Sequence, residues 1–126
     1  MGKYIDNNNF LPEPVINTLM GINHFDQERI ELEIEELESA AITIIEATIN
    51  TKILLSKENG KKLMTVLCKN YVTAKLYEQT TLETYVDLAD LIMNEFKDTL
   101  KRIKEAQQDE NITANETPKI RSLYFG

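Results

Sequence analysis

The sequence predicts an all-α protein, a small bundle of three long helices plus a short N-terminal helix, with an extended C-terminal tail. Apolar residues recur at intervals of three and four along three long stretches, as one face of a helix requires. Only 4 glycines and 3 prolines occur in 126 residues, so few positions interrupt these stretches. We therefore expect one helical domain at residues 1–108, followed by a flexible linker and docking tail at residues 109–126.

Residues at the helix ends place the first two helices. Pro14 suits the first turn of a short helix that Gly21 ends, and Asp26 is a suitable N-cap for a long helix. The long helix is expected to turn one face inward, with these residues: Ile30, Ile34, Leu37, Ala41, Ile44 and Thr48. The acids fall on its other face, which we expect to be solvated: Asp26, Glu28, Glu31, Glu33, Glu35, Glu36 and Glu38.

The second half of the chain supplies two more long helices. Residues 50–60 contain turn-forming residues, and their β-branched side chains also fit a short extended piece. The next helix, KKLMTVLCKNYVTAKLYEQ, has an apolar stripe of Leu63, Leu67, Tyr71 and Ala74, widened by Met64, Val66 and Tyr77. Thr80 and Thr81 are candidate caps for a last helix, from about Leu82 to Gln108, with an apolar face of Tyr85, Ala89, Ile92, Phe96, Leu100 and Ile103.

Charge and composition argue against several classes of partner. The chain has 14 Lys and Arg against 21 Asp and Glu, a net charge of −7, whereas duplex binding needs a concentrated positive surface. No apolar run approaches the roughly 20 residues that would span a membrane, and MGKYIDNNNFLPEP lacks the apolar core of a signal peptide. We expect a protein of the cytosol without specific DNA binding or membrane association.

The residues that carry chemistry are too few for an obvious catalytic or metal site. Cys68 is the only cysteine and His24 the only histidine, which excludes an internal disulfide and a His–His metal pair within one chain. We interpret Cys68 as a small hydrophobe within a helix and His24 as a loop or capping residue. The four glycines stand far apart, so no phosphate-binding loop is present. We expect no enzyme activity, no cofactor and no metal.

The C-terminal segment PKIRSLYFG is the best candidate for a functional site. It follows the mostly polar DENITANET, and in an extended strand its side chains would alternate between two sides. Such a segment can bind a partner through main-chain hydrogen bonds and side-chain pockets, although it can also fold back over its own bundle. The predicted partner-binding residues are Lys119, Ile120, Arg121, Leu123, Tyr124 and Phe125.

The order of these parts resembles the small head–tail connector proteins of long-tailed bacteriophages, also called adaptor or head-completion proteins. The resemblance covers roughly residues 15–108 and lies mainly in ESAAITIIEATI, in KKLMTVLCKNYVTAKLYE and in YVDLADLIMNEFKDTLKRIKEA. Many relatives have an aromatic-Pro or Gly-Arg stretch where this chain has TKILLSKENG, so the role of that loop does not carry over.

The resemblance implies a structural virion protein located at the head–tail interface and assembled in the host cytoplasm. It implies a ring of about twelve copies beneath the portal protein, with a stopper or tail-completion protein bound below. DNA would pass through the ring without specific binding, since an acidic channel surface repels it, and the tail would insert into the portal. The alternative is a small cytosolic helical regulatory module that binds one protein target through its C-terminal peptide.

Overall fold

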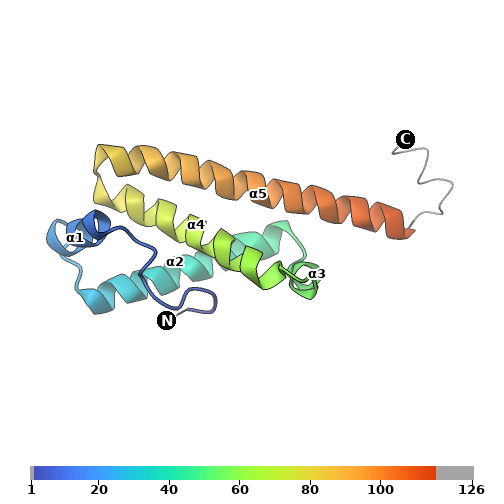
Figure 1. The fold of residues 1–126 in the computed structure, drawn as a ribbon, viewed down its shortest axis with the longest axis horizontal. Coiled ribbons are helices and arrows are strands. Elements are labelled where there is room, and N and C mark those ends of the chain that lie inside the picture. Colours follow the sequence, from blue (N-terminus) through green and yellow to red (C-terminus); the bar gives the residue numbers. More distant parts are fainter. Residues whose placement is uncertain (1, 116–126) are drawn as a thin grey trace.

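The computed structural model describes the backbone of residues 2–115 and the side chains of residues 2–109. This part of the chain forms five helices and no strand: α1 (Glu13–Gly21), α2 (Gln27–Thr48), α3 (Thr51–Ser56), α4 (Gly60–Thr80) and α5 (Glu83–Asn115). The all-α prediction is confirmed for these residues. Figure 1 shows α2, α4 and α5 running side by side, with α4 in the middle and antiparallel to both neighbours.

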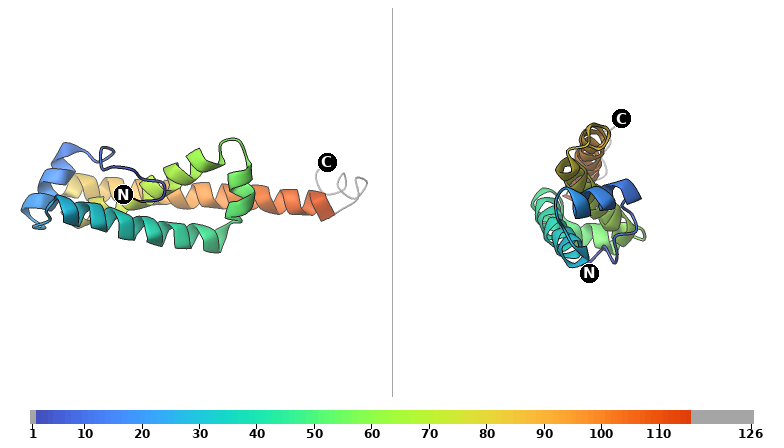
Figure 2. Two further views of the ribbon diagram at one scale, coloured as in Figure 1. Left: turned by 90° about the horizontal axis from the view of Figure 1, so that it is seen from below. Right: turned by 90° about the vertical axis from the view of Figure 1, so that its left-hand side faces the viewer.

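Helix α4 is the centre of the bundle. It contacts α1, α2, α3 and α5, and the two views of Figure 2 show the other helices arranged around it. Its buried residues accordingly point in almost every direction around the helix axis: Met64, Leu67, Cys68, Val72, Ala74, Leu76, Tyr77 and Thr80. Of the residues predicted to widen its apolar stripe, Met64 and Tyr77 are buried but Val66 is exposed.

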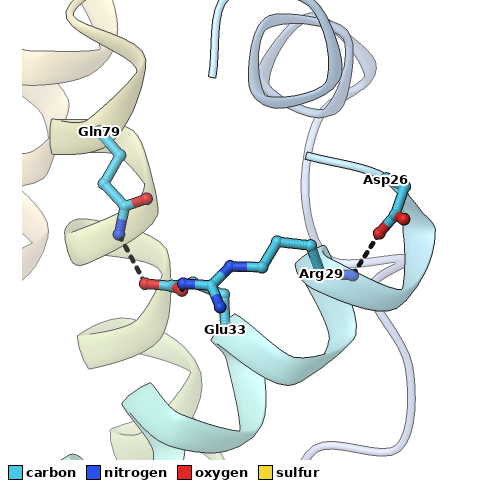
Figure 3. A network of polar contacts seen from close by, with 4 residues as sticks. All are labelled: Asp26, Arg29, Glu33 and Gln79. Atoms are coloured by element: carbon cyan, nitrogen blue, oxygen red, sulfur yellow. Dashed lines mark hydrogen bonds and ion pairs between the residues drawn. The ribbon is translucent and has the colours of Figure 1, made fainter. Parts of the chain in front are cut away.

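Helices α1 and α2 begin as predicted. Pro12 is the N-cap of α1 and Pro14 lies in its first turn, where a missing N–H costs no hydrogen bond. Asp26 is the N-cap of α2, and its side chain accepts a hydrogen bond from the Arg29 N–H at 2.7 Å. The same end of α2 is tied to α4, because the Gln79 amide donates to Glu33 at 3.1 Å (Figure 3).

The inward face of α2 differs from the predicted one. Its buried side chains are Ile30, Ile34, Glu38, Ala41 and Ile45, whereas Leu37 is half-buried and Ile44 is 38% exposed. Both sets step by three and four residues, so helical spacing alone fits either. In the bundle α4 packs on the stripe that contains Ile45, and Ile44 faces the side of α2 nearer α5.

The segment after α2 is helical, so the alternative of an extended piece is wrong. Asn50 accepts a hydrogen bond from the Ile53 N–H at 3.1 Å, which starts the six-residue helix α3, and Leu54 is its buried anchor. Gly60 then begins α4 so close to the Leu54 carbonyl oxygen that a Cβ would overlap it. This close approach brings α3 across the end of α4.

Helix α5 begins after a tight turn at Thr81, which has a left-handed backbone conformation (φ 58°) and ends α4. Ala89, Phe96 and Leu100 are buried as predicted, and Tyr85, Ile92 and Ile103 are half-buried. The Gln107 amide exchanges two hydrogen bonds with the Asn50 backbone, at 2.8 and 2.9 Å. Beyond this contact α5 continues to Asn115, past the expected end at Gln108, and Figure 1 shows its last turns projecting beyond α3.

Adjacent isoleucines of α2 provide a test of its register. Ile45→Asp should lower the free energy of unfolding by more than about 3 kcal/mol, because it leaves an unpaired charge in the core. Ile44→Asp should lower it by only about 1 kcal/mol, because its side chain reaches solvent. Urea denaturation followed by circular dichroism measures both, and equal losses would show that the register is wrong.

Candidate functional site

A groove with an apolar floor lies between α2 and α5. Its volume is about 690 Å³, and α4 forms its base. The floor is made by Ile44 of α2, Tyr71 of α4, and Met93, Phe96 and Leu100 of α5. We call this hollow the α2–α5 groove.

The groove follows from the way the helices pack. Helices α2 and α5 each pack along α4 but make few contacts with each other, so the base between them is partly uncovered. The Tyr71 and Phe96 rings meet there at a centroid distance of 5.4 Å and an angle of 52°. Tilted ring pairs are a favoured aromatic arrangement. The two rings therefore give the floor an ordered apolar surface on which another apolar group can pack.

Lysines dominate the edge of the groove. Lys75 of α4 and Lys97, Lys101 and Lys104 of α5 line it, together with Glu78 and Asp90. The Lys75 ammonium lies 5.6 Å from the centre of the Tyr71 ring, a cation–π distance. The three α5 lysines are exposed and have no hydrogen-bond or ion-pair partner among the residues whose side chains are described. This acidic protein therefore has more lysines than acids around the apolar floor of the groove.

The acids of α2 that were predicted to be solvated are exposed only in part. Asp26, Glu28 and Glu36 are exposed, whereas Glu31, Glu33 and Glu35 are half-buried. Arg29 pairs with Glu33 at 2.9 Å, and Gln27 donates to Glu31 at 3.3 Å (Figure 3 shows the Glu33 contacts). Glu28, Glu35 and Glu36 have no such partner within the described part of the chain. With Leu32, which is 44% exposed, these three carboxylates form what we call the acidic face of α2.

Glu38 contradicts the prediction that all the acids of α2 are solvated. Its side chain is 3% exposed and accepts hydrogen bonds from the N–H groups of Lys3, Tyr4 and Ile5, at 2.6, 3.0 and 2.8 Å. Three converging backbone donors replace the water that the carboxylate loses. A Cβ at Gly2 would overlap this carboxylate, so the chain passes here as closely as glycine allows. Glu38 thereby holds the N-terminal segment on the bundle.

The structure places the other singled-out residues apart from the groove. Cys68 is fully buried, as its interpretation as a small hydrophobe requires. Burial and the nearby Glu38 charge raise the pKa of its thiol to about 12, so it stays protonated at neutral pH. His24 lies exposed in the loop before α2, with a left-handed backbone (φ 57°). The predicted binding residues of the tail, from Lys119 to Phe125, lie outside the described residues.

The described part of the chain offers neither a metal site nor a membrane span. There, no group of three or more His, Cys, Asp or Glu side chains is placed to hold a metal ion. None of the helices there has both the length and the apolar composition needed to cross a membrane.

Sequence reasoning missed the groove, although one signal for it was present. Lys97, Lys101 and Lys104 are spaced by four and three, so they share one side of α5. Ile44 lies beside these lysines because of the way α2 and α5 pack on α4. No local sequence pattern indicates this packing. Comparisons of the chain with protein-family models, curated proteins and solved structures find no match.

Glu38→Gln should detach the N-terminal segment. The amide keeps the size of the side chain but places an N–H₂ group against backbone donors, so we expect a loss of about 2 kcal/mol in the free energy of unfolding. The exposed Glu36→Gln is the matched control and should change it by less than about 0.5 kcal/mol. Denaturant unfolding measures both values, and hydrogen exchange at residues 3–5 reports the detachment. Unchanged protection of these amides in Glu38→Gln would contradict the assignment.

Proposed function

We propose that this protein is a structural adaptor of a long-tailed bacteriophage, located at the head–tail interface of the virion and assembled in the host cytoplasm. In this proposal its copies form a ring, the C-terminal segment binds the portal protein, and a stopper or tail-completion protein binds the opposite side. The protein acts through its surfaces, without catalysis and without a cofactor.

The observation that carries the proposal is the presence of several exposed apolar and charged surfaces on one small helical body. The α2–α5 groove combines an apolar floor with lysines, and the acidic face of α2 carries the opposite charge. Leu88 and Leu91 add an exposed apolar patch on α5, where Leu91 is 66% exposed. Contiguous exposed apolar patches, especially those rimmed by polar residues, often mark surfaces that bind other proteins.

The order of the helices also supports the proposal. A short helix, a long amphipathic helix, a central helix and a long last helix occur in the order on which the resemblance to connector proteins rests. The net charge of −7 would suit a ring that DNA passes, because like charges repel and phosphate contacts need cations. The lysines of the groove would then face a neighbouring protein and not the DNA.

Removal of residues 118–126 tests the proposed binding to the portal. The full chain, mixed with the portal ring of a candidate phage, should elute with it on size exclusion, and light scattering should give the mass of a joint complex. The chain without these residues should stay separate, because Lys119, Arg121, Tyr124 and Phe125 are lost together.

Two variants of the full chain sharpen this test. Leu123→Ser with Phe125→Ser should weaken portal binding at least about tenfold, or about 1.4 kcal/mol, whereas Ser122→Ala is the matched control and should not. A stable monomer or dimer that ignores the portal would overturn the proposal and favour a small regulatory module with a single target.

A further inference from the structure

We propose that the α2–α5 groove binds the acidic face of α2 from a second copy of this chain. The inference deepens the proposed function, on which it rests for the closure of a ring, because it identifies the two surfaces through which neighbouring copies meet. It requires that the two surfaces match in shape, in apolar content and in charge.

The acidic face has the pattern of a helix that docks in a groove. The exposed Leu32 is surrounded by three carboxylates. Glu28 lies four residues before it, and Glu35 and Glu36 lie three and four residues after it. Residues at these spacings are neighbours on the helix surface, so one apolar anchor is surrounded by negative charge. Docked helices of this kind bury an apolar stripe and leave charges for the edge of the groove.

The groove offers the complementary pattern. Its apolar floor of Ile44, Tyr71 and Phe96 can receive the Leu32 side chain. At the edge stand Lys97, Lys101 and Lys104, whose ammonium groups have no partner among the side chains that the structure describes. Opposite charges at the rim of an interface set its orientation and speed its formation more than they add affinity. Glu78 and Asp90 also line the groove and would repel acids. The docked carboxylates are therefore expected beside the α5 lysines.

The placement of the two surfaces on α2 makes the contact heterologous. Leu32 and Ile44 are twelve residues apart in the sequence, which at 3.6 residues per turn separates them by about 120° around the helix. The acidic face and the groove thus lie on different sides of α2, and each copy can use both at once. A contact between two different patches continues from copy to copy and gives a ring if the rotation closes.

The chain's own C-terminal segment is a poorer match for the groove. Lys119 and Arg121 carry the same sign of charge as the groove lysines, and no acid lies between Pro118 and Gly126. A second copy offers carboxylates and an exposed leucine on a preformed helix, which loses little conformational entropy on binding.

Charge reversal of each surface tests the contact. Lys97→Glu with Lys101→Glu reverses the groove, and Glu28→Lys with Glu35→Lys reverses the acidic face. Sedimentation velocity over a concentration series should show self-association of the unaltered chain that weakens with added salt. Each double variant alone should associate at least about tenfold more weakly. An equimolar mixture of the two should regain a mass above that of the monomer, because each then offers the other a complementary surface.

Two controls keep the test specific. Lys61→Glu with Lys62→Glu reverses two exposed lysines at the start of α4, outside the groove, and should leave association unchanged. Ile44→Asp should weaken association while thermal melting by circular dichroism shows a folded chain. The inference would be overturned if the Lys61/Lys62 control associated as weakly as the groove variant, or if the mixture of the two double variants stayed monomeric.

The outcomes also separate this inference from the proposed function. If the unaltered chain stays monomeric and the groove variant loses binding to a portal or stopper protein, the groove serves another partner and the second-copy inference fails. If portal binding is kept while charge reversal leaves self-association unchanged, the inference fails and the adaptor proposal stands. If self-association follows the charges but no portal binds, the adaptor proposal fails and the contact between copies stands.

Discussion

The burial of α4 on almost every side is the constraint on which the rest of this structure depends. A helix with core residues all around its axis needs other elements to cover it, and here α1, α2, α3 and α5 each supply one side. Hydrophobic burial at roughly 25 cal/mol per Å² favours this arrangement over any in which α4 lies at an edge. The positions of α2 and α5, and hence the groove between them, are consequences of covering α4.

Because the outer helices pack on α4, they make few contacts with each other. Helices α2 and α5 meet only weakly, so apolar side chains such as Ile44 and Met93 border solvent and lysines extend around them. On the other side of α2, Leu32 remains exposed among acids. A single copy therefore has two surfaces whose apolar parts are uncovered and whose charges are opposite.

Local sequence signals predicted where most of the helices lie, whereas tertiary packing decided which of their side chains are buried. Pro14, Asp26 and the spacing of apolar residues placed α1, α2, α4 and α5, because caps and periodicity are set by neighbours in the sequence. The choice between Ile44 and Ile45 was not predictable, since AAITIIEATI is apolar on most sides. Burial of Glu38 depends on backbone donors 33 to 35 residues away, and an acidic residue on a polar stretch gives no local sign of such a contact.

Zero-length carbodiimide cross-linking of a mixture of unlabelled and ¹⁵N-labelled full chains tests the central claim most directly. The reagent joins a lysine to a carboxylate in contact, and peptides of mixed isotope composition identify links between copies. The account predicts mixed links that join Lys97, Lys101 or Lys104 to Glu28, Glu35 or Glu36. Links of mixed composition that avoid these residues, or links confined to single copies at concentrations where the chain self-associates, would contradict it.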